Sequence, residues 1–398
     1  MSVQPAGLPD KPKLIIIGPT PPPFHGVSVA IETLLKSRLT DAFDVTHLEL
    51  ADRRGIAHVN KPDWYDVALF IRQWLHLWRL LLVRRPQIVY LVLSQTTVGF
   101  IRDSLLIWPS LLLGGEIVAH LHGGAMREWY ESRWPPMRGY IRAVLGAVAK
   151  IIVLGESLRP ICSGLLPDDR IVVVPNGVDL REDEPEPKPL KGARPWRILH
   201  LNTLNRMKGT LVLLEAIPVV LTRRRDVRFV LAGPWSHEDH RIEAEQYVAQ
   251  HRLEDFVTST GQVAGQEKWE LFRSADLFVF PGVQQEGQPL VVLEAMAAGL
   301  PVLFTNQGCL RETVANGEAG LEVGTNNPHD LAARILWLLD QPQERRRMGE
   351  NARRRCRTLF SRDRHIERMI EVLGEAAIES SVVRPSPFVS THHGSPHT

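Results

Sequence analysis

Short apolar runs alternate with helical stretches along most of the chain, and this alternation constrains the fold more than any other feature. The runs are rich in branched side chains and lack the polar alternation of a half-exposed strand, which is typical of strands buried on both faces of a parallel sheet. In the first half they cover residues 14–17, 88–93, 117–119, 151–154 and 171–174. Such strands, separated by helices, predict a parallel sheet with helices on both faces.

The same alternation restarts after a polar, proline-rich segment. Residues 181–189 read REDEPEPKP, a composition that continues neither a helix nor a strand and is typical of an extended linker. Beyond it the apolar runs cover residues 197–201, 229–232, 277–280, 301–304 and 320–323. We therefore predict an α/β protein of two doubly wound, Rossmann-like domains that face each other across a cleft, with ligands at the carboxyl ends of the strands.

The predicted boundaries follow from these segments. At 398 residues the chain exceeds one ordinary hydrophobic core. We expect an N-terminal domain at 11–180, a linker at 181–196 and a C-terminal domain at 197–358. A helix at 359–380 should pack back on the N-terminal domain, and the Ser, Pro and His-rich residues 381–398 should be a disordered tail.

Composition narrows the class of protein. Hydrophobic residues make up 44% and charged residues 23%, as in soluble globular proteins, and a net charge of +2 gives no electrostatic footprint for nucleic acid. The three cysteines, Cys162, Cys309 and Cys356, lack metal-like spacing and favour a reducing compartment. No signal peptide opens the sequence, and the most apolar run, 105–113, is shorter than the about 20 residues of a spanning helix. We expect a cytoplasmic protein that does not cross a membrane.

Two glutamates lie on either side of a predicted junction between a loop and a helix. A helix is predicted at 289–298, with a proline at its start and a glycine and a proline as its stop signal. Its free backbone N–H groups should lie beside Glu286, Gly287 and Gln288, where a ligand phosphate could be held. Glu294 lies within the helix, and a buried glutamate needs donors such as vicinal hydroxyls. The alternative is that both glutamates are solvated.

Three other segments carry candidate ligand-binding residues. Gly26 lies at a predicted helix start and lets backbone N–H groups approach an anion, although the loop lacks the three glycines of a nicotinamide site. Lys208 and Arg206 follow the first strand of the second half and are cations suited to a diphosphate. His120 and His122 share one face of a strand end. The alternatives are a plain turn, a surface lysine and a pair of metal ligands; no cluster completes a metal site.

Two stretches of the first half, 71–85 and 127–142, combine arginines with aromatic residues. That pairing suits an anionic membrane surface or a phosphorylated lipid headgroup. The alternative is a helix whose tryptophans face the core and whose arginines face solvent. The sequence leaves both interpretations open.

Taken together, these segments resemble the nucleotide-sugar-dependent glycosyltransferases of the two-domain GT-B fold. The similarity is to the large retaining group that includes glycogen synthase and many bacterial polysaccharide enzymes, known as glycosyltransferase family 4. The family signature is a glutamate, seven residues and a second glutamate, and it matches Glu286 and Glu294. The accompanying residues are also in place: Gly287, Pro289, Ala295, Gly299, Pro301 and Val302. Residues 174–179 and 308–321 are similar to two further family segments.

The resemblance implies an acceptor-binding N-terminal domain and a C-terminal domain that binds the nucleotide sugar. Glu294 would hold the ribose, while Glu286 and the backbone of Gly287 and Gln288 would hold the donor sugar. Pro289 and Leu290 complete the same donor-binding segment.

The resemblance also assigns residues around the diphosphate. Lys208 would match the lysine that binds it, and Gly26 the glycine loop beneath it. His122 would match the histidine near the reacting sugar carbon, with His120 as the alternative register. The family often has an arginine six residues before the lysine, where this sequence has Asn202. Arg206 is then the candidate for the second cation.

We therefore expect a retaining glycosyltransferase that moves a sugar from a nucleotide diphosphate sugar to a hydroxyl of a saccharide acceptor. The expected acceptor is lipid-linked, in cell-surface polysaccharide or glycolipid synthesis at the inner face of the membrane, with no cofactor, no required metal and no nucleic-acid partner. One alternative is a nucleotide-sugar epimerase of the same fold. The other is a noncatalytic nucleotide-sugar-binding protein, suggested by Asn202.

Overall fold

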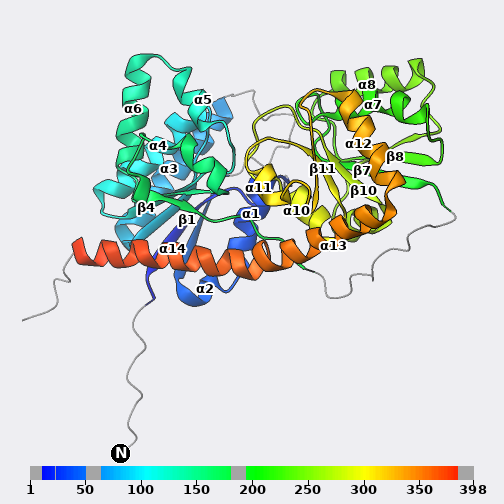
Figure 1. The fold of residues 1–398 in the computed structure, drawn as a ribbon. Coiled ribbons are helices and arrows are strands. Elements are labelled where there is room, and N and C mark those ends of the chain that lie inside the picture. Colours follow the sequence, from blue (N-terminus) through cyan, green and yellow to red (C-terminus); the bar gives the residue numbers. More distant parts are fainter. Residues whose placement is uncertain (1–10, 23, 51–63, 181–193, 384–398) are drawn as a thin grey trace, which may run out of the picture.

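The computed structural model describes residues 11–22, 24–50, 64–180 and 194–383. Figure 1 shows two domains, each built on a six-stranded sheet with helices on both faces. The strand orders are β2-β1-β3-β4-β5-β6 and β12-β11-β10-β7-β8-β9, and neighbouring strands are parallel. The predicted fold class of two doubly wound, Rossmann-like domains is confirmed.

The N-terminal domain buries both faces of its central strands. In β1, Ile15 and Ile17 enter one hydrophobic core, while Leu14 and Ile16 enter the other. The strands are β1 (Lys13–Gly18), β2 (Asp44–Glu49), β3 (Ile88–Val92), β4 (Glu116–His120), β5 (Lys150–Val153) and β6 (Ile171–Val173). The helices are α1 (Gly26–Leu35), α2 (Leu39–Ala42), α3 (Trp64–Arg84), α4 (Thr97–Leu112), α5 (Met126–Glu131) and α6 (Pro135–Gly146), with short 3₁₀ turns at Glu156–Ile161 and Asp168–Arg170.

In the C-terminal domain, β7 and β10 are neighbours at the centre of the sheet although they are far apart in sequence. The connections after these two strands leave in opposite directions, which makes their carboxyl ends the usual ligand position in such sheets. The strands are β7 (Trp196–Leu201), β8 (Val227–Ala232), β9 (Val257–Gly261), β10 (Leu277–Phe280), β11 (Val302–Thr305) and β12 (Gly320–Val323). The helices are α7 (Thr210–Leu221), α8 (Glu238–Gln250), α9 (Gly265–Ser274), α10 (Leu290–Ala297), α11 (Leu310–Val314), α12 (Pro328–Asp340) and α13 (Pro342–Leu359).

The last helix, α14 (Arg362–Val383), continues from α13 and runs along the underside of the N-terminal domain (Figure 1). Its apolar side chains, among them Met369 and Leu373, pack into the N-terminal core with Leu14 and Ile16. The chain thus returns to the domain in which it began.

Some details differ from the sequence expectations. The strands β2 and β9 were not among the expected runs, because both are edge strands with polar, partly exposed residues. The strand β7 begins at Trp196, inside the segment expected as linker. Residues 181–193 of that linker and 384–398 of the expected tail lie outside the described residues.

Candidate functional site

Two glycine-containing loops from opposite domains lie against each other. A side chain on Gly287, which follows β10, would collide with the backbone oxygen of His122. A side chain on Gly124, which follows β4, would collide with the backbone oxygen of Glu286. Glycine is needed at both positions because the two backbones are in direct contact. The domains therefore meet at the loop that carries the predicted sugar-binding residues.

Lys208 and Glu286 are brought together across the centre of the C-terminal sheet. Lys208 lies in the turn after β7, Glu286 lies in the loop after β10, and Nζ is 2.5 Å from Oε1. The turn is fixed by Asn205, whose Oδ1 accepts a 2.8 Å hydrogen bond from the backbone N of Lys208. Both side chains are largely buried, with 20% and 12% exposed. The structure thus places a cation and a carboxylate at the predicted ligand position.

Glu294 lies on α10, and only one of its two carboxylate oxygens has a hydrogen-bond partner among the described residues. Oε1 is 2.5 Å from Nζ of Lys268 on α9. Oε2 is shielded from solvent and has no hydrogen-bond partner among the described residues. Burial raises the pKa of Glu294, while the charge of Lys268 acts in the opposite direction. An oxygen in this state suits a ligand hydroxyl that donates a hydrogen bond.

Lys268 is a site residue that the sequence did not reveal. It lies in a polar amphipathic helix, three residues into α9, and belongs to none of the motifs considered above. Only the pairing of α9 with α10 in three dimensions shows that its ammonium reaches Glu294.

Gln288 and the residues after it have a structural role in this arrangement. The Gln288 side chain accepts a 2.7 Å hydrogen bond from the backbone N of Asn176 and donates a 3.0 Å bond to Thr313. Asn176 Nδ2 in turn donates to the backbone oxygen of Gln288 at 2.8 Å. Pro289 is the N-cap of α10 and Leu290 its first residue. Gln288 therefore ties the glycine loop to the segment that follows β6.

The two histidines of the N-terminal domain share a face, as their alternation predicts. Their ring centroids are 4.1 Å apart, and Nδ1 of His120 lies 2.8 Å from the Tyr90 hydroxyl. Nε2 of each ring has no partner among the described residues. Burial lowers the pKa of His122 to about 3 and that of His120 well below its usual range. Both rings are therefore neutral near pH 7.

The remaining candidates are placed differently. Gly26 begins α1 and faces open space, with no atom near the position of a Cβ. Arg206 is not brought to Lys208, because its guanidinium pairs with Glu243 on α8 and is mostly exposed. Asn202 keeps its Oδ1 for the backbone N of Thr203 at 2.9 Å, while its Nδ2 is buried without a partner among the described residues.

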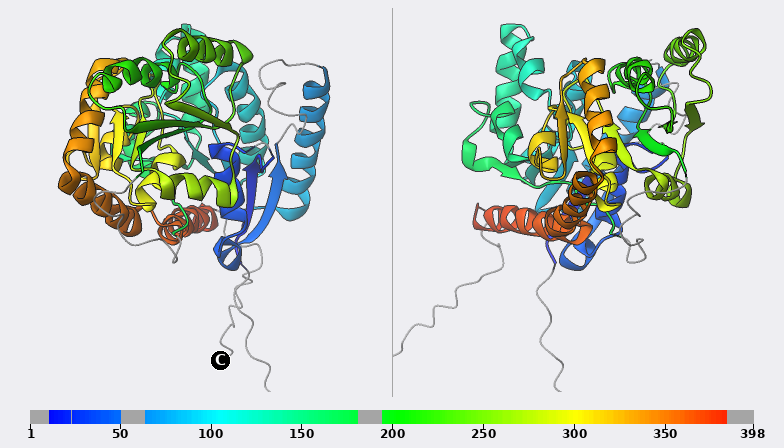
Figure 2. Two further views of the ribbon diagram at one scale, coloured as in Figure 1. Left: turned by 90° about the vertical axis from the view of Figure 1, so that its right-hand side faces the viewer. Right: turned by 45° about the vertical axis from the view of Figure 1, so that its right-hand side comes forward.

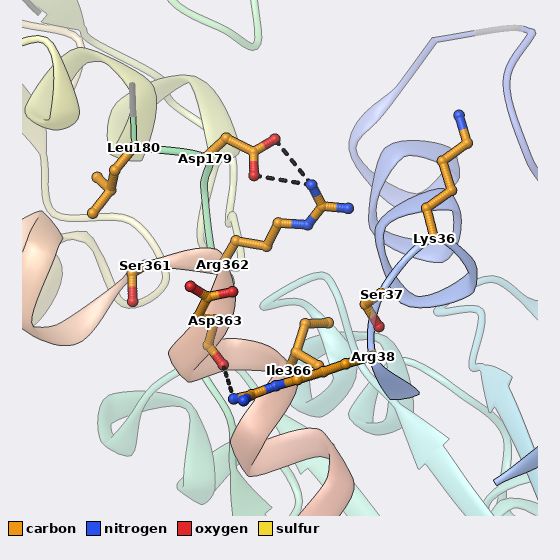
Figure 3. A pocket seen from close by; sticks show the side chains of 9 residues that line it. All are labelled: Lys36, Ser37, Arg38, Asp179, Leu180, Ser361, Arg362, Asp363 and Ile366. Carbon is orange, nitrogen blue, oxygen red and sulfur yellow. Dashed lines mark hydrogen bonds and ion pairs between the residues drawn. The ribbon is translucent and has the colours of Figure 1, made fainter. Parts of the chain in front are cut away.

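A pocket of about 370 Å³ lies elsewhere, beside the junction of α13 and α14 (Figure 3). Its wall includes Arg362, which pairs with Asp179 at 3.0 Å, and Lys36 and Arg38 from the N-terminal domain. None of the predicted site residues lines it. Within the described residues, no group of three or more His, Cys, Asp and Glu side chains is arranged to hold a metal ion.

The sequence is similar to known glycosyltransferases, most clearly in its C-terminal half. Residues 182–355 match the family described as "Glycosyl transferases group 1". The chain is 34% identical over 193 residues to a D-inositol 3-phosphate glycosyltransferase of Paenarthrobacter aurescens, covering 46% of this chain and 47% of that protein. It is 31% identical over 176 residues to a phosphatidyl-myo-inositol mannosyltransferase of Mycolicibacterium smegmatis, covering 44% of each. The matches span about half the length of these relatives.

The fold extends the similarity to both domains. The structure of Anabaena Alr3699/HepE in complex with UDP superposes with a TM-score of 0.73, covering 91% of this chain and all of that one, at 18% identity. At this identity the match shows a common fold, the two-domain GT-B architecture.

Proposed function

We propose that this protein is a group 1 glycosyltransferase, the family whose model matches residues 182–355, and that it moves a glycosyl unit from a nucleotide diphosphate sugar to an acceptor hydroxyl. The observation that carries the proposal is the pair of lysine-held carboxylates at the centre of the C-terminal sheet. Glu286 is paired with Lys208, and Glu294 is paired with Lys268. The carboxyl ends of β7 and β10 are where such a sheet binds a nucleotide.

Each member of the pair has a separate task in the proposed mechanism. The unpartnered Oε2 of Glu294 accepts a hydrogen bond from a ribose hydroxyl. Glu286 binds hydroxyls of the donor sugar at the loop where the domains meet. The Lys208 ammonium and the N-terminal N–H groups of α10 stabilise the negative charge that builds on the departing diphosphate. In this scheme, the bond between the sugar and the diphosphate, which breaks, lies next to the ion pair of Glu286 and Lys208.

The N-terminal domain supplies the other side of the reaction. The backbone oxygen of His122 lies against Gly287, and we propose that the neutral ring of His122 faces the donor sugar bound at that loop. Contact between the domains excludes water, which would otherwise compete with the acceptor. We propose retention of the anomeric configuration, no required metal and no cofactor. The scheme assigns no second cation to the diphosphate, because Arg206 pairs with Glu243.

Two steps test the proposal. A thermal-shift screen against nucleotide diphosphate sugars finds the donor, because a ligand that binds the folded state raises its apparent stability. Transfer to an acceptor panel is then compared for the native chain, Lys208→Ala and Glu286→Ala. We expect each variant to lose about a hundredfold or more in kcat, as for removal of a group that stabilises transition-state charge. Native turnover in both variants would rule out these roles.

The same assay separates the alternatives. Conversion of the donor without any acceptor would identify an epimerase. Binding of the donor with neither hydrolysis nor transfer across the panel would identify a noncatalytic binding protein.

The acceptor that we propose is a lipid-linked saccharide at the cytoplasmic face of a membrane. The name of the mannosyltransferase relative, which acts on a phosphatidyl-myo-inositol, supports an acceptor of this kind. None of the helices in the described residues is both long and apolar enough to span a bilayer. We propose that the protein reaches such an acceptor by contact with the membrane surface.

A further inference from the structure

Helix α4 turns a stripe of apolar side chains toward solvent. The stripe recurs at intervals of three and four residues and so follows one face of the helix. It consists of Val98, Ile101, Leu105, Trp108 and Leu112. Val98 and Leu112, near its two ends, are each 76% exposed. The opposite face, including Phe100 and Leu106, is buried in the N-terminal core, so the helix is apolar on both sides.

Helix α3 lies beside α4 and carries a second stripe of the same kind. The indole N–H of Trp74 donates a 2.9 Å hydrogen bond to the backbone oxygen of Leu105, which fixes the two helices side by side. The left view of Figure 2 shows α3 at the outer edge of the N-terminal domain. The exposed residues of the α3 stripe are Trp64, Val67, Ile71, Leu75 and Leu82. Exposed apolar surface of this extent, gathered on one domain, marks a docking surface.

The exposed charged side chains that the structure describes on this surface are arginines. Among the charged residues of α4, Arg102 and Asp103 pair with each other at 2.7 Å, and the Asp103 side chain is buried. On α3, Arg72 and Arg79 are exposed and form no ion pair with any described residue. The α3 and α4 face therefore combines apolar side chains and tryptophans with exposed arginines, which is the composition of helices that lie in a membrane interface.

The exposed arginines favour an anionic lipid bilayer over a second copy of the chain as the partner of this face. A second copy of the chain, related by a two-fold axis, would bring the same arginines together, and the carboxylate of α4, Asp103, is buried and already paired with Arg102. An anionic lipid bilayer supplies the missing negative charge and takes up the apolar stripes. We propose that the α3 and α4 face docks the protein on an anionic membrane surface.

The docking face leads to the candidate active site. The loop before α4 carries Gln95, whose side chain donates to the backbone oxygen of Gly123 and accepts from the backbone N of Ala125, both at 2.9 Å. The first exposed residue of the stripe, Val98, lies three residues after Gln95, which contacts the loop that follows His122. A lipid-linked saccharide could reach the sugar-transfer site while its lipid stays in the bilayer. This last step rests on the proposed function, whereas the docking itself does not.

Flotation of the full chain with vesicles tests the proposal. Phosphatidylcholine vesicles with and without phosphatidylglycerol are compared, and the protein should float with the anionic ones. Replacing Arg72 and Arg79 by Gln should weaken binding about fivefold for each arginine. Replacing Val98, Leu105 and Leu112 by Ser should weaken it on the order of a hundredfold or more, because apolar burial supplies most of the affinity.

Matched controls come from the C-terminal domain. Ile242 and Trp337 are each 41% exposed, similar to Ile101 and Leu105, and their replacement by Ser should leave flotation unchanged. Every variant should keep the thermal shift that a nucleoside diphosphate gives the native chain, which shows that it is folded. Donor binding and transfer to a water-soluble acceptor are measured without vesicles, so failure of the proposed function is seen separately.

Three outcomes overturn the docking proposal. The first is no flotation on anionic vesicles. The second is equal flotation on neutral vesicles with no effect of the arginine replacements. The third is a dimer in solution that the serine replacements dissociate, since the face would then be an interface between copies of the chain.

Discussion

At the scale of single residues, the ion pair of Lys268 and Glu294 controls the charge of a nearly buried carboxyl group. Burial alone favours the protonated form of Glu294, and the adjacent ammonium opposes this. A protonated carboxyl loses acceptor capacity, so the charge of Lys268 should matter for the affinity of a ribose that donates hydrogen bonds to Glu294.

We predict that Lys268→Met shifts the pH dependence of nucleotide binding to higher pH. Without the ammonium, the pKa of Glu294 rises further, and affinity should fall up to about tenfold for each pH unit below that pKa. Calorimetric titration with a nucleoside diphosphate over a range of pH measures the effect. Lys36→Met, which removes an exposed lysine paired with Glu32, serves as the control. Parallel pH profiles for the native chain and Lys268→Met would contradict this role.

The sequence predicted relative positions that follow from spacing along one element. It did not predict contacts between side chains of different elements. The alternation of His120 and His122 predicted that both rings lie on one face, and the rings are adjacent. Arg206 was expected near the diphosphate, but a nearby carboxylate on α8 binds it instead. Lys268 could not be found, because its partner lies on another helix and no local pattern reports that packing.

At the scale of elements, the domains meet through two loops that have no room for side chains. The loops follow β4 and β10, and their contact sets the distance between the histidine and the carboxylate sides of the site. The apolar runs of the sequence located the central strands well, since buried strands need such runs. They did not locate the edge strands β2 and β9, whose polar residues are partly exposed.

We predict that Gly124→Ala separates the domains without unfolding either of them. The added methyl group collides with the backbone oxygen of Glu286, so the loops must move apart. Turnover should fall about a hundredfold, as for small misplacements of reacting groups, while nucleoside diphosphate binding stays close to native. Small-angle scattering should show a larger radius of gyration.

Gly139→Ala is the matched control. Gly139 is exposed on α6, has no atom within 4 Å of a Cβ position, and should tolerate or favour alanine. Native turnover in Gly124→Ala would show that the contact between the loops is not needed for catalysis.

At the scale of the whole molecule, burial keeps four of the histidines that the structure describes in neutral form. Burial lowers the pKa of His122 to about 3, of His200 and His365 to about 4, and of His120 well below 6.5. These groups take up protons in the unfolded chain below its usual histidine pKa of 6.5, while the folded protein does not. The stability they contribute is present above pH 6.5 and is lost as the pH falls from 6.5 toward the folded values.

We predict that the free energy of unfolding falls steeply in mild acid, by up to about 1.4 kcal/mol per pH unit for each buried histidine. Urea unfolding at about pH 7 and about pH 5 measures the slope. His200→Gln should lower the slope by the share of one histidine, even if it also lowers stability at neutral pH. His329→Gln, at an exposed position, should leave the slope unchanged. Equal stability at both pH values would contradict the prediction.

The return of α14 to the N-terminal domain also determines how the domains can move. The chain crosses between them twice, and the two crossings are joined by backbone hydrogen bonds of 2.9 Å between Val178 and Phe360 and between Arg362 and Val178. Because the two attachments are adjacent, we expect the domains to move relative to each other chiefly by a hinge rotation about them. The pocket lined by Asp179 and Arg362 lies beside these two crossings, so that rotation would displace it little.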